Sequence, residues 1–138
     1  MALRRDAKVK LIGTVPLFAR CSKRALQQIA AMADELDVPE GRKLTREGEA
    51  GSEFFIILQG TAEVRRRGRR IRTLGPGDFL GEIALVTRVP RTATVTATSP
   101  LDVLVITARE FRSLLERTPA VQTKVLEALA ERLAATSL

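Results

Sequence analysis

The sequence predicts an α+β fold that is mainly β: an antiparallel eight-strand β-roll of the jelly-roll type, with helices before it and two helices after it. Three observations carry this prediction. Both ends of the chain show helical periodicity, short apolar segments with turn signals fill residues 35–106, and those segments leave no room for βαβ crossovers. The length of 138 residues favours one domain whose core needs no disulfides.

The first 34 residues are expected to be helical in two pieces, roughly 3–12 and 22–34, because Pro16 interrupts the pattern. Ser22 suits the N-cap position of the second piece. The apolar face of that piece follows the i, i+3, i+4, i+7 spacing of a helix: Leu26, Ile29, Ala30 and Ala33.

The middle of the chain changes to short strands separated by turn residues. EFFIILQG is a compact apolar strand that Gly60 ends, and TAEVRRRG and RRIRTLG flank Gly68 like the arms of a hairpin. Two later strands, RTATVTATS and LDVLVIT, separate at Pro100. Strands at such close and even spacing favour antiparallel pairing.

The last third returns to helix. Thr107 and Glu110 match a capping box, and Phe111, Leu114 and Leu115 form the buried stripe of the first helix. A second helix is expected to open at Pro119. Its apolar side comprises Val121, Val125, Leu129 and Leu133.

The composition excludes several classes of function. The chain has no His, Tyr or Trp and a single cysteine, Cys21. Without imidazole, the usual nucleophile activation and the commonest metal ligand are missing, so we expect a protein that is not an enzyme, with no catalytic residue and no metal site. One cysteine cannot form an intrachain disulfide and favours the cytoplasm. We expect no signal peptide and no transmembrane segment, since no apolar run approaches ~20 residues.

The segment GEIALVTRVPRTATV, residues 81–95, places two charges in an apolar stretch, Glu82 and Arg91. Buried charges are costly unless they are paired or bound to a ligand, so the two either pair with each other or await a ligand. Residues 82–86 could form one helical turn whose N–H groups face an anion. Arg91 suits phosphate and Glu82 accepts from a hydroxyl, a combination that fits a nucleotide.

This segment resembles the phosphate-binding cassette of the cyclic nucleotide-binding domain family, which includes the catabolite activator protein, the protein kinase A regulatory subunit and cyclic nucleotide-gated channels. The matching positions are Gly81, Glu82, Ile83, Ala84, Leu85, Pro90, Arg91, Thr92 and Ala93. The resemblance implies a single domain over 1–138. Its parts would be N-terminal helices (1–34), a β-roll (35–106) with the cassette at 81–94, and C-terminal lid helices (107–138).

The resemblance also implies a role for each cassette residue. Glu82 would accept from the ribose 2′-hydroxyl, and Arg91 would pair with the exocyclic phosphate oxygens. Gly81 would pack against the sugar. The backbone N–H groups of three residues would complete the phosphate shell: Ile83, Ala84 and Ala93.

The ligand implied is a 3′,5′-cyclic purine nucleotide, with cAMP favoured over cGMP, and Thr92 is the cassette residue that bears on the base. The last helix would close over the base, with Arg132, Leu129 and Leu133 as lid residues; Arg132 could lay its guanidinium on the purine. The chain would then be a regulatory sensor that switches its C-terminal helices and draws Leu85 toward them.

Several alternatives stay open. The C-terminal helices could serve as a homodimer seam or contact an effector domain instead of acting as a lid. The chain could be the sensor part of a transcription regulator, channel or transporter, or a degenerate domain that binds no nucleotide.

A separate feature is the stretch TAEVRRRGRRIR, residues 61–72. Its six arginines and one glutamate account for five of the seven net positive charges of the chain. One interpretation is a patch for nucleic acid or anionic lipid. The other, which we favour, is an exposed hairpin whose charge keeps a sheet edge soluble. No aromatic residue interleaves to stack bases, so nucleic acid is not an expected partner.

Overall fold

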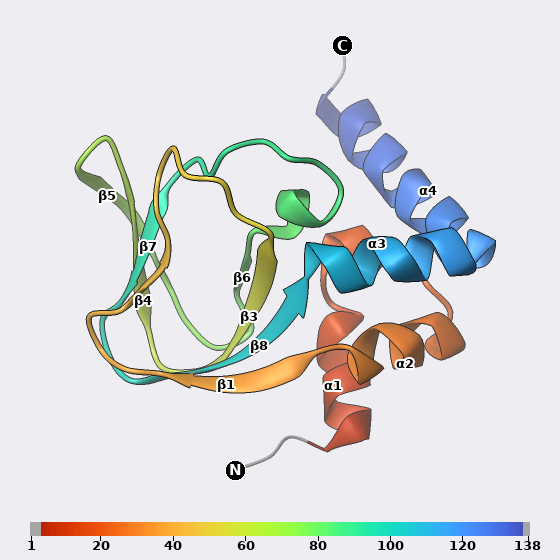
Figure 1. Cartoon of the computed structure of the whole chain (residues 1–138), viewed down its shortest axis with the longest axis horizontal. Coiled ribbons are helices and arrows are strands. Elements are labelled where there is room, and N and C mark those ends of the chain that lie inside the picture. Colours follow the sequence, from red (N-terminus) through yellow and green to blue (C-terminus); the bar gives the residue numbers. More distant parts are fainter. Residues whose placement is uncertain (1–3, 137–138) are drawn as a thin grey trace. The chain divides into compact units, whose positions relative to one another are not determined.

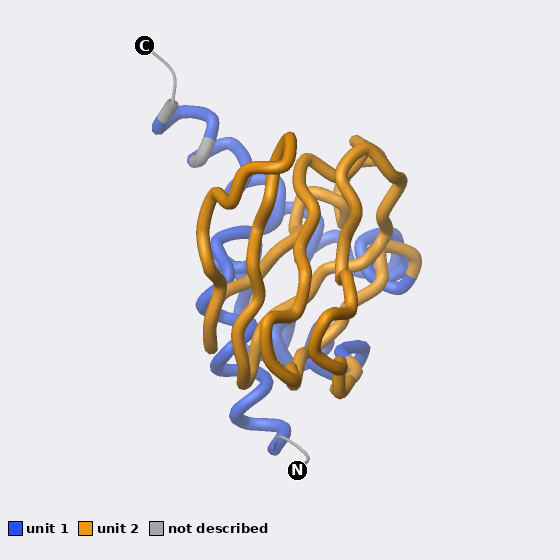
Figure 2. The backbone as a smooth tube through the Cα atoms, turned by 90° about the vertical axis from the view of Figure 1, so that its left-hand side faces the viewer, with its two compact units in different colours: residues 1–33, 110–138 blue, residues 34–109 orange. Residues whose placement is uncertain are grey.

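The computed structural model describes residues 4–136, and the side chains of Arg132 and Thr136 lie outside the described part. The chain separates into two compact units (Figure 2). The first comprises residues 1–33 and 110–138, and the second comprises residues 34–109. The expectation of a single domain over the whole chain stays a prediction.

The first unit is helical (Figure 1). Its elements, with α3 starting at the boundary between the units, are α1 (Arg5–Ile12), the 3₁₀ helix η1 (Pro16–Phe18), α2 (Lys23–Ala31), α3 (Ala108–Arg117) and α4 (Pro119–Thr136). Ser22 caps α2 as expected, because its Oγ accepts from the N–H of Ala25 at 3.1 Å. No described helix has the length and apolar character needed to cross a bilayer.

The predicted end of α2 is wrong. The helix ends at Ala31 and not at 34, because Asp34 already belongs to a strand, where it pairs with Val105. The tertiary pairing of this strand overrides the helical periodicity that continued through Ala33.

The C-terminal helices follow the expected apolar stripes over part of their length. Phe111 is fully buried and its ring centroid lies 5.5 Å from that of Phe18. Pro119 opens α4, as predicted. The buried side of α4 consists of Val121, Val125 and Ala128. Leu133 was expected on this side but is 70% exposed, so the buried stripe does not reach the end of the helix.

The second unit is a roll of two antiparallel sheets, which confirms the predicted jelly-roll architecture. The strands are β1 (Asp34–Val38), β2 (Lys43–Thr45), β3 (Glu53–Gln59), β4 (Ala62–Arg66), β5 (Arg69–Leu74), β6 (Phe79–Leu80), β7 (Thr94–Ala97) and β8 (Leu101–Thr107). One sheet has the order β1-β8-β3-β6 and the other β2-β7-β4-β5. Between β6 and β7 lies the short 3₁₀ helix η2 (Glu82–Leu85).

The core of the roll draws on both sheets. Its buried residues are Val38, Phe55, Ile57, Ala62, Leu74, Val95, Ala97, Leu101, Val103 and Val105. Strands β3 and β8 carry runs of consecutive buried residues, 54–57 and 103–106, so both faces of these two strands are buried. The most apolar strands therefore lie in the middle of their sheet.

The hairpin predicted around Gly68 is confirmed. Strands β4 and β5 are joined by Arg67 and Gly68, whose φ angles are 53° and 77°. Positive φ at both turn residues is typical of a type I′ turn, which matches the twist of the two strands. The hairpin puts β5 at the edge of its sheet.

Candidate functional site

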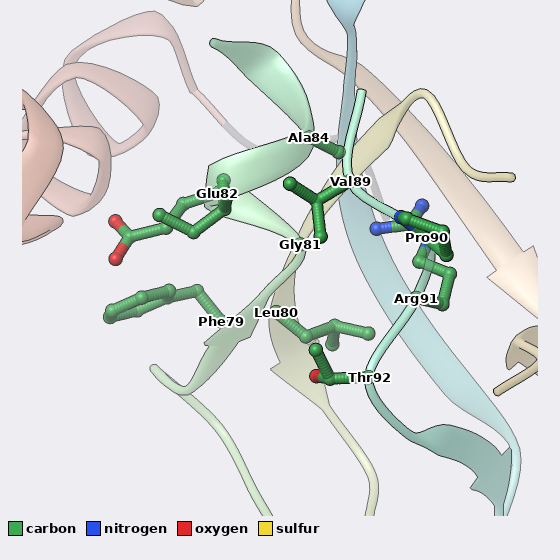
Figure 3. A pocket seen from close by; sticks show the side chains of 10 residues that line it. Phe79, Leu80, Gly81, Glu82, Ala84, Val89, Pro90, Arg91 and Thr92 are labelled. Atoms are coloured by element: carbon green, nitrogen blue, oxygen red, sulfur yellow. The ribbon is translucent and has the colours of Figure 1, made fainter. Parts of the chain in front are cut away.

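The second unit contains a cavity of about 300 Å³ beside η2 (Figure 3). Its lining residues are Phe79, Leu80, Gly81, Glu82, Ile83, Ala84, Val89, Pro90, Arg91 and Thr92. An adjoining cavity of about 210 Å³ shares five of these residues and adds Ala93. The structure thus brings the seven residues predicted to bind ligand around these two cavities. The first cavity is at the small end of the ~300–1,000 Å³ usual for ligand sites.

The turn at the start of this site forms because of Gly81. This residue has φ 82° and ψ 14°, the left-handed conformation that glycine adopts without steric cost. After it the chain makes the helical turn η2, in which the N–H of Ala84 donates to the carbonyl of Gly81 at 3.0 Å. Ala84 is buried, whereas Ile83 is 43% exposed beside the cavity.

Glu82 is one of two buried polar side chains in the described part of the molecule, with 6% of its surface exposed. It is the first residue of η2, so the turn at Gly81 fixes where its carboxylate lies. In Figure 3 this carboxylate lies on the side of the site where Phe79 projects. Glutamate is almost never buried without a specific interaction, and an ionised carboxylate can only accept hydrogen bonds.

Arg91 is held between two glycines. A Cβ at Gly51 would overlap its Nε, and a Cβ at Gly81 would lie 2.5 Å from its Nη1. Its Nη2 donates to the carbonyl of Glu53 at 2.7 Å. Burial lowers the pKa of Arg91 and the nearby Glu53 carboxylate opposes this change. An arginine stays protonated at neutral pH, so the site keeps a fixed positive charge.

The two charges of the cassette lie apart (Figure 3). Arg91 has a partner of its own, because its Nη2 donates to the carbonyl of Glu53. Figure 3 shows the Glu82 carboxylate and the Arg91 guanidinium on different sides of the cavity, the latter behind Pro90. The site therefore offers a hydrogen-bond acceptor and a cation at separate positions, and one ligand could contact both.

Backbone hydrogen bonds fix the segment between η2 and β7 that carries Arg91. The N–H of Gly48 donates to the carbonyl of Arg91 at 2.8 Å, and the N–H of Arg91 donates to the carbonyl of Glu49 at 2.9 Å. Further along, the hydroxyl of Thr45 donates to the carbonyl of Ala93 at 3.0 Å. Because its main chain is bonded on both sides, Arg91 is presented from a rigid support.

Some residues of the site were not expected from the sequence. Arg66 and Arg72 line the adjoining cavity, and the Nε of Arg66 donates to the carbonyl of Thr92 at 3.0 Å. The alternation of side chains along a strand is a signal that could have found them. By this alternation Arg66 lies on the same face of β4 as Val64, and Arg72 on the same face of β5 as Leu74. All four residues line the adjoining cavity. The close approach of Gly51 to Arg91 has no such local signal, because it depends on tertiary contact.

The residues expected in the lid belong to the first unit. Leu129 is half-buried and Leu133 is exposed, while the side chain of Arg132 lies outside the described residues. Their role over a ligand stays a prediction. Within the part of the chain that the structure describes, no group of His, Cys, Asp and Glu is arranged to hold a metal ion.

Comparison with protein families gives one match over the part of the chain that contains the site. The model named cyclic nucleotide-binding domain matches residues 35–118, which is more than half of the chain and includes every strand but the first residue of β1.

Two curated relatives extend this match. A cyclic nucleotide-gated potassium channel of Rhizobium etli is 32% identical over 123 residues, covering 89% of this chain and 34% of the channel. A cAMP-dependent protein kinase regulatory subunit of Mycosarcoma maydis is 36% identical over 121 residues, covering 81% of this chain and 23% of that subunit. The chain thus spans about a third or less of the length of these relatives.

Among solved structures, the N-terminal domain of a transcriptional regulator from Streptomyces coelicolor A3(2) is similar over nearly its whole length. The match has a TM-score of 0.84 and 28% identity, and it covers 92% of this chain and 94% of that domain. The similarity therefore includes the helical elements as well as the roll.

Proposed function

Since the chain belongs to the cyclic nucleotide-binding domain family, we propose that it binds a 3′,5′-cyclic purine nucleotide, with cAMP as the preferred ligand, in the cavity beside η2. The observation that carries this proposal is the separation of Glu82 and Arg91 within one cavity. A 3′,5′-cyclic nucleotide has a free ribose 2′-hydroxyl and a single phosphate charge, and the two side chains match these two groups.

In this proposal Glu82 accepts from the ribose 2′-hydroxyl. Its position at the start of η2 and its 6% exposure leave its carboxylate little freedom, so the acceptor is oriented before the ligand arrives. Pre-organisation of this kind reduces the entropy lost on binding.

Arg91 pairs with the exocyclic phosphate oxygens. Its guanidinium uses Nη2 on the Glu53 carbonyl, and its other N–H groups stay available for the ligand. The N–H groups of Ile83, Ala84 and Ala93 would complete the phosphate shell, and Gly81 would lie against the sugar. For Ala84 this means exchanging its bond to the Gly81 carbonyl.

The preference for one purine base depends on Thr92. Thr92 lines both cavities. In this proposal its hydroxyl contacts either the phosphate or the base. The cAMP-dependent kinase subunit is a relative whose name includes this ligand, which supports cAMP as the choice. Because cGMP differs from cAMP only in the base, the ratio of their affinities measures this preference.

We propose no chemical step. The nucleotide would leave unchanged, and its effect would be a shift of the C-terminal helices, the last of which closes over the base. A ligand shifts such an equilibrium only as far as its affinities for the two states differ. The output would then reside in an effector outside this chain or in a second copy of it. The expected cytoplasmic location rests on the cysteine content and stays a prediction.

Calorimetric titration with cAMP, cGMP and 5′-AMP tests the proposal. We expect cAMP to bind most tightly and 5′-AMP, which lacks the ring phosphate, to bind far more weakly. Arg91→Ala should weaken cAMP binding roughly 10- to 150-fold, the value of a charge-assisted hydrogen bond. Arg88→Ala is the matched control, because Arg88 is exposed and does not line the cavity.

The role of Glu82 is tested with 2′-deoxy-cAMP. The unaltered chain should bind this analogue more weakly than cAMP, whereas Glu82→Gln should discriminate between them much less. Failure of every cyclic nucleotide to bind the folded protein would overturn the proposal. Tighter binding of cGMP would overturn only the choice of base, and recovery of a 5′-monophosphate after incubation would contradict the absence of chemistry.

A further inference from the structure

The tip of the β4–β5 hairpin, defined as residues Arg65–Arg72, contains six arginines among eight residues. Every residue of the tip is exposed. Figure 1 shows the two strands running out together to a narrow turn at one edge of their sheet. The tight two-residue turn brings six arginines close together, and like charges at such spacing repel one another unless a counter-charge is near.

Three of these arginines have partners within the roll. Arg65 pairs with Glu63, Arg66 donates to the Thr92 carbonyl, and Arg72 lies 3.9 Å from the Asp78 carboxylate. These contacts brace the hairpin from its inner side and its base.

The other three arginines have no acidic partner among the described residues: Arg67, Arg69 and Arg70. The backbone N–H of Arg67 donates to the Glu47 carboxylate at 2.9 Å, which holds the turn and not the guanidinium. Three guanidinium groups thus project from a braced, narrow turn. Each one presents five donors in a planar fork that fits a phosphate group.

An apolar side chain lies among these charges. Ile71 is 48% exposed, although its neighbours Arg70 and Arg72 are charged. It falls where the pairing of β5 with β4 shifts register, between the pairs Val64–Arg72 and Arg65–Arg70. The core of the roll does not use this isoleucine.

We propose that the hairpin tip docks on an anionic lipid surface. The guanidinium groups would contact lipid phosphates, and Ile71 would enter the boundary between head groups and acyl chains, where a cationic and apolar surface is stabilised. A nucleic-acid backbone would match the charges but would leave Ile71 in water. No aromatic residue in 61–72 offers a stacking platform for bases. The proposal is independent of nucleotide binding.

Vesicle sedimentation with the unaltered chain tests this docking. The chain should bind vesicles of phosphatidylcholine that contain roughly a third phosphatidylserine, bind pure phosphatidylcholine vesicles weakly, and dissociate as salt screens the charges. The triple variant Arg67→Gln, Arg69→Gln, Arg70→Gln should lose roughly a hundredfold in partition coefficient. It leaves the cavity-lining arginines Arg66 and Arg72 in place.

The matched control removes three exposed arginines elsewhere: Arg5→Gln, Arg24→Gln, Arg109→Gln. Both triple variants have the same net charge, so only the position of the lost charges differs. Equal loss of vesicle binding in the two variants would overturn the proposal, because net charge alone would then explain the attraction. Circular dichroism of both triple variants checks that they are folded.

Two further arms separate a lipid surface from a polynucleotide. Ile71→Ser should weaken vesicle binding roughly fivefold through lost apolar burial. Unchanged binding would overturn the proposal that Ile71 enters the membrane boundary. A mixed-sequence DNA duplex titrated at the same ionic strength should bind more weakly than the anionic vesicles. Tip-dependent binding of the duplex without binding of vesicles would assign the surface to nucleic acid instead.

Discussion

The cassette and the hairpin tip both depend on arginine, and they use it in opposite ways. The cassette has one guanidinium, Arg91, held between Gly51 and Gly81 and hydrogen-bonded to the Glu53 carbonyl. The tip has three exposed guanidinium groups with no acidic partner among the described residues. A guanidinium fixed in one orientation suits a ligand of one geometry, whereas several exposed guanidinium groups suit a charged surface. The surroundings of an arginine, more than the number of arginines, therefore decide what it can bind.

The largest expected effect tests how tightly the cassette is built. Gly81→Ala forces an alanine to φ 82°, at a cost of about 1–2 kcal/mol. Its Cβ would also lie 2.6 Å from the backbone carbonyl of Glu53, which cannot move easily. We expect chemical denaturation to show a loss of at least ~2 kcal/mol in the free energy of unfolding.

Gly77→Ala separates the two causes of this loss. Gly77 has a similar φ of 89°, but a Cβ there would meet no atom within 4 Å. This variant should lose only the conformational part of the stability. Equal losses at the two glycines would show that the cassette is not crowded around Arg91.

The second prediction acts on Arg91 without backbone strain. A Cβ at Gly51 would overlap the Arg91 side chain, and Gly51 does not have a positive φ. Gly51→Ala should therefore displace the guanidinium and weaken cyclic nucleotide binding roughly tenfold by calorimetry, equivalent to ~1.4 kcal/mol. The matched control is Gly75→Ala, where a Cβ meets nothing within 4 Å. If both variants bind alike, the glycine does not position Arg91.

These glycines mark the limit of what the sequence predicts. The strands, the hairpin at Gly68 and the turn after Gly81 follow from local patterns, and the structure has them where expected. The end of α2 was missed because the pairing of Asp34 with β8 overrides periodicity. The exposure of Leu133 was missed because periodicity does not tell how far along α4 the burial extends, and Ala128 is the last buried residue among those described in this helix. The contact between Gly51 and Arg91 joins residues 40 positions apart, and no local pattern reports it.

The third prediction concerns the residue that joins the two regions. Arg66 belongs to the hairpin, lines the cavity adjoining the cassette and donates to the carbonyl of Thr92. Arg66→Ala removes this bond, worth about 0.5–1.5 kcal/mol, and should weaken nucleotide binding by roughly two- to tenfold. Arg69→Ala, at the exposed tip, should leave nucleotide affinity unchanged. An equal loss of nucleotide affinity in Arg69→Ala would mean that the hairpin affects the site only through its positive charge, and not through the hydrogen bond of Arg66.

The smallest expected effect concerns Asp102, and it tests whether burial also changes the pKa of a carboxylate in the same unit. Burial raises the pKa of Asp102, and the neighbouring Glu35 and Asp37 carboxylates raise it further. A carboxyl whose pKa is higher in the folded state contributes stability at acid pH, and this contribution is lost as pH rises through the folded pKa. Asp102→Asn should therefore match the unaltered chain in acid and be slightly more stable at neutral pH.

Thermal unfolding measured across this pH range provides the check, with Asp6→Asn as the control at an exposed carboxylate. The difference in melting temperature between Asp102→Asn and the unaltered chain should grow as pH rises, and more than the difference that Asp6→Asn produces. A constant difference would mean that Asp102 is as well solvated as the arginines of the tip. A difference that grows with pH would show that burial changes the pKa of Asp102, as it does that of Arg91. Exposed charges of either sign, by contrast, leave stability nearly unaffected.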